Sequence, residues 1–275
     1  MKNKTKLPLS IIIPCADDTR IKYCLDSIDE EVEVVVVLNG ASKEVKQIVS
    51  EYNIKKVIVS ERNLPKALNA GIENSKYKHV LFMDADCVFE RGAIRKLLGG
   101  MGESYLAKGN VIFQRNNFTS EIIAKVREYL TSDPPRPYNP FLCMRKDIRK
   151  HIDNYYFDND IHWTEDADLN VRVTRAGIKV KYVMSAKIFH PPLTMKYDLK
   201  SSFRYGIGKR IRIEKGIAKG LGSFFRNIPD VISKKGIFPG IYLFIWNCFY
   251  TAGFIYQIIG DPYNVRSLTL KQNEA

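Results

Sequence analysis

The chain has 275 residues, enough for one large α/β domain with an appendage but too few for two full catalytic domains. Hydrophobic residues make up 45% of it and charged residues 27%, which excludes a chain that is disordered for lack of a core. The net charge of +13 is concentrated, since ten Lys or Arg against two acidic residues give +8 within residues 200–235, next to an uncharged run at 236–260. This arrangement favours an anionic membrane surface over nucleic acid as the partner.

Short apolar runs alternate with helical patterns in the first part of the chain. The runs at residues 9–14, 33–38, 57–60 and 79–83 are typical of strands buried on both faces of a parallel sheet. Helices are predicted between them near residues 20–28, 41–52 and 65–76, the last with Pro65 in its first turn. The alternation predicts a doubly wound α/β sheet that binds ligands at the carboxyl ends of its strands.

The second part of the chain is more varied. Residues 104–116 indicate an antiparallel strand, 118–132 a helix and 133–140 a Pro-rich loop. A helix is predicted over 164–176, with Thr164 as N-cap and Gly177 as its stop, followed by two short strands that end at His190. The five cysteines form no close C-x-x-C pair, which indicates reduced, buried thiols.

The 25 uncharged residues at 236–260 predict a C-terminal hydrophobic helix. Such a helix would be about 37 Å long, against roughly 30 Å of bilayer hydrocarbon. Spanning the membrane, lying on its surface and packing under the catalytic domain all stay open. The N-terminal residues do not complete a signal peptide, so the α/β domain is expected on the cytoplasmic face of the cell membrane, as a peripheral or single-span protein.

Two pairs of acidic residues lie at the boundaries of predicted elements, one pair after a strand and the other at the start of a helix. Asp84 and Asp86 directly follow the strand at 79–83, where adjacent carboxylates suit a Mg²⁺ or Mn²⁺ ion that bridges to phosphate. Glu165 and Asp166 fall at the start of a helix, where the helix dipole favours an ionised carboxylate that could serve as a general base. The alternatives are an ordinary turn for the first pair and helix-dipole complementation for the second.

Five segments resemble those of family 2 glycosyltransferases in order and approximate interval: IIIPCADD, VVVVLNGAS, NLPKALNAG, FMDADC and TEDADLNVRVTRAGIKVKYV. The similarity covers about residues 8–210. It implies a GT-A type, doubly wound and mostly parallel sheet flanked by helices. The domain is expected over residues 1–195, with a basic helical region and the hydrophobic helix in 196–275.

The resemblance also implies roles for individual residues. Asp86 would bind the metal, Asp84 would face the ribose or a metal-bound water, and His190 would close the metal or diphosphate site unless it is structural. Asp166 would be the catalytic base, with Glu165 beside it. The donor site would be lined by Pro14, Cys15, Ala16, Asp17, Asn39 (where the family usually has Asp) and Lys66 (after Pro65 instead of the usual Gly). Arg204 and Lys209 would contact the diphosphate or form a solvated basic helix face, and Ser201 and Tyr205 replace the Gln and Trp of a motif found in processive relatives.

The function implied is an inverting, metal-dependent transfer of a sugar from a nucleoside diphosphate sugar to an acceptor hydroxyl. A glycan or a lipid-linked acceptor in cell-surface glycan, polysaccharide or glycolipid synthesis is expected. A sugar-nucleotide pyrophosphorylase is a second hypothesis, weakened because no Gly-rich loop follows the first strand. A catalytically inactive, membrane-anchored interaction module is a third.

Overall fold

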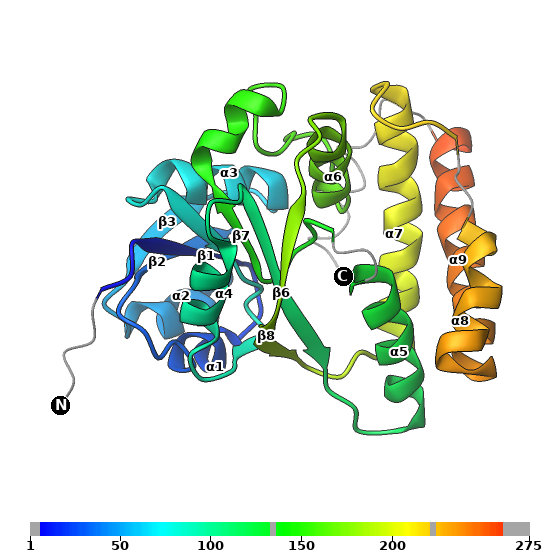
Figure 1. Ribbon diagram of the computed structural model, residues 1–275, viewed down its shortest axis with the longest axis horizontal. Coiled ribbons are helices and arrows are strands. Elements are labelled where there is room, and N and C mark those ends of the chain that lie inside the picture. Colours follow the sequence, from blue (N-terminus) through cyan, green and yellow to red (C-terminus); the bar gives the residue numbers. More distant parts are fainter. Residues whose placement is uncertain (1–5, 133–135, 221–223, 261–275) are drawn as a thin grey trace. The chain divides into compact units, whose positions relative to one another are not determined.

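The computed structural model describes residues 6–132, 136–220 and 224–260 (Figure 1). The chain divides into two compact units. The first comprises Met1–Gln114 and Leu130–Pro192, and the second comprises Arg115–Tyr129 and Leu193–Ala275. Residues 133–135 of the expected Pro-rich loop lie outside the described residues.

The first unit is built on an eight-stranded sheet in the order β3-β2-β1-β4-β7-β6-β8-β5. The pairs β3–β2, β2–β1, β1–β4 and β6–β8 are parallel, while β4–β7, β7–β6 and β8–β5 are antiparallel. The predicted doubly wound, mostly parallel sheet is therefore confirmed. The strands are β1 (Leu9–Cys15), β2 (Glu33–Asn39), β3 (Lys55–Val59), β4 (His79–Phe82), β5 (Val88–Phe89), β6 (Leu106–Phe113), β7 (Leu142–Arg145) and β8 (Val180–His190).

Helices flank this sheet (Figure 1). Helix α3 packs against β1 and β2, and a Cβ added at its Gly71 would lie 2.3 Å from Ile12 Cγ2, so only glycine permits that approach. The central strand is covered on both faces, as its apolar run predicts, because Ile11, Ile12 and Ile13 are all fully buried. The helices of this unit are α1 (Ile21–Asp26), α2 (Lys43–Ser50), α3 (Leu64–Asn74), α4 (Ala93–Met101) and α6 (Glu165–Arg175), with a 3₁₀ turn at Lys146–His151.

Several local predictions need correction. The two short strands expected before His190 are one strand, β8, whose pairing with β6 jumps from Gly109↔Val183 to Asn110↔Lys187. The strand expected over 104–116 is antiparallel to β7 but parallel to β8, because it runs between two neighbours of opposite direction. Thr164 is the N-cap of α6, but its side chain makes no capping hydrogen bond.

A buried ion pair between Asp168 and Arg172 anchors helix α6. Arg172 is 2% exposed and bonds Asp168 Oδ2 through Nε at 3.0 Å and Nη2 at 2.7 Å. The same guanidinium donates to the backbone carbonyls of Ile152, Tyr155 and Tyr156 at 2.6–3.1 Å. Every polar group of this pair therefore has a partner, and the start of α6, with Glu165 and Asp166, is held against the 152–156 segment.

The second unit is helical and contains most of α5 (Phe118–Ser132), α7 (Met195–Glu214), a 3₁₀ turn (Phe224–Arg226), α8 (Asn227–Lys235) and α9 (Ile237–Ile259). At its centre Asp198, fully buried, accepts hydrogen bonds from Arg127 and Tyr242 at 2.6 Å each. Helix α9 is long and apolar enough to cross a membrane by length and composition. Cys248, on α9, is exposed, whereas the other four cysteines are buried, so the expectation that all five are buried was wrong.

Replacing Arg172 with Met should lower the free energy of unfolding by about 3–5 kcal/mol, because it strands the buried Asp168 charge and three carbonyls. Arg175→Met, at an exposed position of the same helix, is the matched control and should change stability by less than about 0.5 kcal/mol. Urea unfolding followed by circular dichroism measures both. Equal effects of the two substitutions would contradict the structural role given to Arg172.

Candidate active site

The strand order places two acidic loops at one edge of the sheet. Asp84 and Asp86 leave the carboxyl end of β4, and Asp86 Oδ2 lies 3.3 Å from Arg20 Nη2. Arg20 is itself held by Asp18 through a bidentate contact at 2.8 Å and 2.5 Å. The loop after β1 and the loop after β4 thus meet through one guanidinium, which supplies positive charge to the Asp86 carboxylate.

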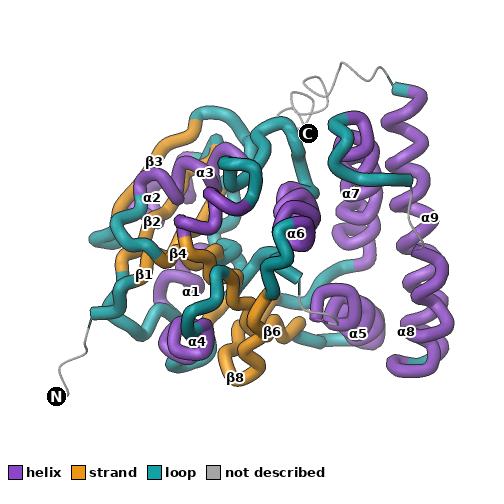
Figure 2. Tube along the Cα trace, turned by 45° about the horizontal axis from the view of Figure 1, so that its top comes forward, coloured by secondary structure: helices purple, strands orange, loops and turns teal. Residues whose placement is uncertain are grey.

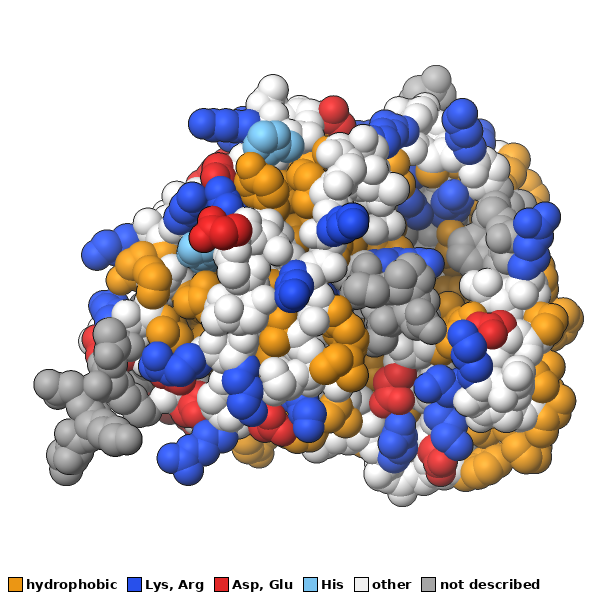
Figure 3. All heavy atoms as spheres, in the orientation of Figure 1, with side chains coloured by type: hydrophobic (Ala, Val, Ile, Leu, Met, Phe, Trp, Pro, Cys, Tyr) orange, Lys and Arg blue, Asp and Glu red, His pale blue; other side chains and the backbone are white. Residues whose placement is uncertain are grey.

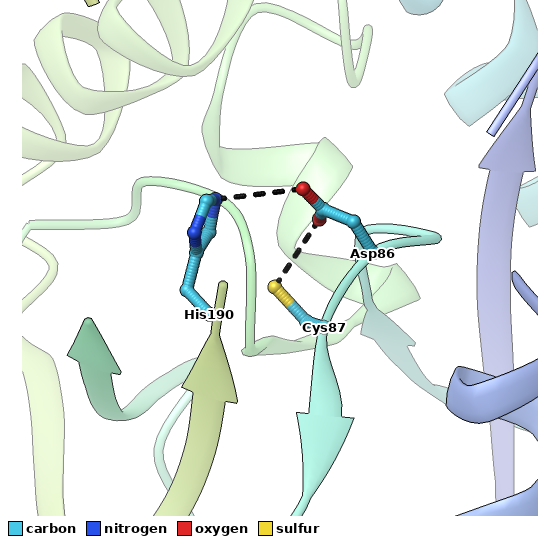
Figure 4. Close-up of side chains that lie close together, drawn as sticks. All are labelled: Asp86, Cys87 and His190. Carbon is cyan, nitrogen blue, oxygen red and sulfur yellow. Dashed lines mark hydrogen bonds and ion pairs between the residues drawn. The ribbon is translucent and has the colours of Figure 1, made fainter. Parts of the chain in front are cut away.

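His190 approaches Asp86 from the end of β8 (Figure 4). Its Nδ1 lies 2.8 Å from the carbonyl oxygen of Pro191, which can only accept a hydrogen bond, so Nδ1 carries the proton. The other ring nitrogen, Nε2, lies 3.8 Å from Asp86 Oδ2. A neutral His190 therefore presents a lone pair on the side of the carboxylate.

The donor set at this point fits a divalent cation. Single ligand atoms of Asp86, Cys87 and His190 all lie within 4.8 Å of one another. Burial and the neighbouring carboxylates of Asp84 and Asp86 raise the pKa of the Cys87 thiol well above its usual range, and a soft sulfur ligand suits Mg²⁺ or Mn²⁺ less well than oxygen does. Carboxylate and imidazole remain, and the carbonyl that fixes the His190 tautomer is the kind of outer partner that metal-binding histidines have.

A second group of ionisable residues surrounds Asp84. Burial and the charge of Asp86 raise the pKa of Asp84 to about 7, with a smaller increase from Asp166. Lys108, on β6, is 2% exposed and its ammonium donates to the carbonyl of Pro140. Burial lowers the pKa of Lys108 to about 8, while the charges of Asp84 and Asp166 oppose that shift. The β4 loop, β6 and α6 therefore bring carboxylates and one buried cation within electrostatic reach of one another.

The neighbouring carboxyl groups of α6 have different environments. Glu165 is 4% exposed, its Oε2 has no hydrogen-bond partner, and burial followed by the charge of Asp166 raises its pKa well above the usual range. Asp166 is only half-buried. Asp166 lies in the first turn of α6, where the helix dipole favours a carboxylate.

Most residues expected to line the donor site lie at the ends of β1 and β2, in the loop after β1 and in the first turn of α3. Pro14 and Cys15 end β1, and burial raises the pKa of the Cys15 thiol to about 12, so it is not a nucleophile. The carbonyl of Ala16 accepts from Ser42 N at 3.0 Å. Asp17 forms an ion pair with Arg62.

Asn39 and Lys66 are engaged with the protein itself. The Asn39 amide oxygen accepts from Asn63 N at 2.9 Å, and Asn63 Oδ1 in turn caps α3 by accepting from Lys66 N at 2.9 Å. The Lys66 ammonium pairs with Glu61. Asn39 thus orders the start of α3, and its contact with a nucleotide base stays a prediction.

Arg204 and Lys209 lie on α7, in the second unit, and burial lowers the pKa of each. Their contact with a diphosphate stays a prediction.

Sequence reasoning missed two basic residues that the fold brings to these carboxylates. Lys108 is the single charged residue in the strand LAKGNVIF, and a charge between apolar neighbours of a buried strand is a signal that could have been used. Arg20 had no such signal, because nothing in the stretch after β1 distinguishes it from a solvated surface arginine.

Comparison with known proteins places this geometry in a family. The pattern of glycosyl transferase family 2 matches residues 10–151, more than half of the chain. The search of curated protein sequences found no match to this chain.

Solved structures share the fold at low sequence identity. TarS of S. aureus, residues 1–349, superposes with a TM-score of 0.56 at 16% identity, over 83% of this chain and 73% of that one. The same fragment in complex with UDP-GlcNAc gives a TM-score of 0.56 at 17% identity, over 75% and 66%. The mannosyltransferase PcManGT from Pyrobaculum calidifontis, in complex with GDP-Man and Mn²⁺, gives 0.59 at 14% identity, over 98% and 80%.

The fold is therefore the GT-A type implied by the sequence motifs. With a sequence match over more than half its length and this shared fold, the chain belongs to glycosyl transferase family 2 and is a glycosyltransferase.

Proposed function

We propose that the protein transfers a sugar from a nucleoside diphosphate sugar to an acceptor hydroxyl, with inversion at the anomeric carbon, in the synthesis of a cell-surface glycan, polysaccharide or glycolipid. The observation that carries the proposal is the convergence of Asp86, His190 and the start of α6 at the carboxyl edge of the sheet. The family match favours transfer over the pyrophosphorylase alternative.

In this proposal Asp166 takes the proton of the acceptor hydroxyl. Its half-buried carboxylate sits in the first turn of α6, while Glu165 beside it is held neutral by burial. A neutral Glu165 can donate a hydrogen bond through its carboxyl group, and this bond would orient the acceptor or Asp166. The attack is a single displacement, so no covalent nucleophile is needed, in keeping with buried, protonated thiols at Cys15 and Cys87.

Asp86 and His190 would hold Mn²⁺ or Mg²⁺, as the complex of PcManGT with GDP-Man and Mn²⁺ illustrates for that protein. When bound, such an ion neutralises charge that develops on the leaving nucleoside diphosphate. Arg20 and Lys108 contribute positive charge near Asp86 and Asp84, and so limit the repulsion among the carboxylates.

The assignment of Asp86 and Asp166 is tested by donor turnover. Asp86→Asn and Asp166→Asn should each lower nucleoside diphosphate release by roughly 10²–10⁴-fold, because one loses the metal ligand and the other the general base. The assay combines purified protein, Mn²⁺ or Mg²⁺, a panel of nucleotide sugars and a mixed glycan acceptor. Chelation by EDTA should abolish release and added Mn²⁺ should restore it.

Asp160→Asn, an exposed acidic position on the segment before α6, is the matched control and should retain full activity. Undiminished release by Asp166→Asn would contradict its assignment as the general base, whereas no release by the wild-type protein with any donor would favour the inactive-module hypothesis. Undiminished release by Asp86→Asn would instead contradict the metal site alone.

The role of Lys108 is tested by pH dependence. Lys108→Met should lower turnover at pH 7 by at least about tenfold, or ~1.4 kcal/mol, because its charge offsets those of Asp84 and Asp166. Since its pKa is about 8, the wild-type protein should lose activity as the pH rises through that value. The variant should lack this loss.

Lys187→Met serves as the control, because this lysine lies on the neighbouring strand β8 but is 40% exposed and pairs with Glu90. An alkaline limb that persists unchanged in Lys108→Met would show that another group titrates there.

A further inference from the structure

Helix α9 is more polar on the face it buries than on the face it exposes. Its inner face carries Asn247 and Gln257, which are 1% and 3% exposed, together with Tyr242 and Trp246. Exposed residues recur along α9 every three or four positions, so they form one side of the helix, its outer face. That face consists of Ile237, Phe238, Ile241, Phe244, Ile245, Cys248, Phe249, Ala252, Ile255, Tyr256, Ile258 and Ile259.

This apolar surface extends beyond α9. The exposed ring of Phe118, on α5, lies 5.4 Å from that of Phe238, and the exposed ring of Phe225 lies 5.8 Å from that of Phe244. Figure 3 shows hydrophobic side chains gathered along the edge where α8 and α9 lie. A soluble surface rarely keeps so large a continuous apolar patch in water. We call the outer face of α9 with Phe118 and Phe225 the α9 surface.

Positive charge borders the α9 surface. Arg226 is exposed directly after Phe225, and Lys234 and Lys235 end α8 just before Ile237. Apolar side chains with lysine and arginine at their border match the hydrocarbon boundary and the anionic headgroups of a bilayer. A second protein chain would have no need of that border, so charge favours a lipid surface as the occupant.

The packing of α9 on α7 decides how the helix meets the membrane. The two helices lie side by side (Figure 1, Figure 2). They run in the same direction, because Tyr242 contacts Asp198, Ser202 Oγ donates to Trp246 O at 2.6 Å, and Gly206 lies against Tyr250. A Cβ at Gly206 would come within 1.9 Å of the Tyr250 carbonyl, so the backbones themselves are in contact.

A spanning α9 would therefore carry α7 into the hydrocarbon with it. Helix α7 bears eight charged residues, which are costly at that depth: Lys196, Asp198, Lys200, Arg204, Lys209, Arg210, Arg212 and Glu214. A helix that lies in the plane of the interface buries only its outer face and leaves α7 on the water side.

We propose that α9 docks in the plane of an anionic membrane surface through the α9 surface, and does not cross the bilayer. This inference rests on the second unit alone and is independent of the chemistry assigned to the first. A chain docked in this way is a peripheral membrane protein.

Docking is tested by sedimenting the full chain with vesicles of phosphatidylcholine alone or of an equal mixture of phosphatidylcholine and phosphatidylglycerol. The wild-type chain should bind the mixed vesicles, and the double variant Ile241→Asp/Phe249→Asp should bind at least tenfold more weakly. Ile58→Asp, at an apolar position of β3 that is 74% exposed, is the matched control and should bind normally.

Equal binding by the double variant, or no binding by the wild type, would overturn the proposal. So would a stable dimer in analytical ultracentrifugation that the same double variant abolishes, since a second copy would then cover the surface. Nucleoside diphosphate release with a soluble acceptor should be the same in the double variant and the wild type, which separates a failure of docking from a failure of the transferase assignment.

The orientation is tested at Cys248, which is exposed and lies midway along Ile237–Ile259. A fluorophore on this thiol should be quenched by lipids labelled near the headgroup, because an in-plane helix lies about 5–10 Å below it. A spanning helix would place the fluorophore at the bilayer centre, and stronger quenching by lipids labelled at the acyl chain ends would refute the in-plane arrangement. Cys248→Ser shows how much label the four buried cysteines take up.

Discussion

Repulsion among carboxylates at one edge of the sheet is the main electrostatic constraint on this structure. Asp84, Asp86, Glu165 and Asp166 converge there, and their shared burial drives the pKa of Asp84 to about 7 and that of Glu165 well above its usual range. Such an edge is stable only where protons, basic side chains or a metal ion offset the charge. The buried ammonium of Lys108 and the guanidinium of Arg20 supply part of it, and a divalent cation bound with its substrate would supply the rest.

The acidic residues at this edge are held in position by hydrogen bonds between side chains and backbone, which are harder to recognise in the sequence than the acidic motifs. The Asp168–Arg172 pair ties α6 to the carbonyls of the segment before it, so that Asp166 is held while its partner Glu165 is kept out of water. His190 is oriented by a backbone carbonyl, and Asn39 orders the start of α3. In each case a polar group that would be costly to bury alone is satisfied by the backbone, which fixes the geometry of its neighbour.

The second unit has a different organising principle. Its polar core, with Asp198 bonded to Arg127 and Tyr242, occupies the space between helices, while apolar side chains face outwards on α9. An outer face of this kind is covered if the helix docks on a membrane surface, as proposed above. Composition alone left the role of α9 ambiguous. The apolar content of α9 is high enough for a membrane span, but the helix packed along it, α7, carries too many charged residues to enter the bilayer with it.

The sequence by itself determined the four parallel strands β1 to β4, the helices between them and the positions of the acidic pairs, because apolar periodicity and strand-end carboxylates are local patterns; it did not indicate β5, β7 or α4. It did not determine that β8 is one irregular strand, because that depends on its pairing with the distant strand β6. It also did not show that Arg20 and Lys108 face the acidic residues. Arg20 meets Asp86 across 66 positions of the chain, and Lys108 is brought near Asp84 and Asp166 by the folding of the sheet. Tertiary structure alone decided which face of α9 is buried, because hydropathy sums over a helix while packing acts on one side of it.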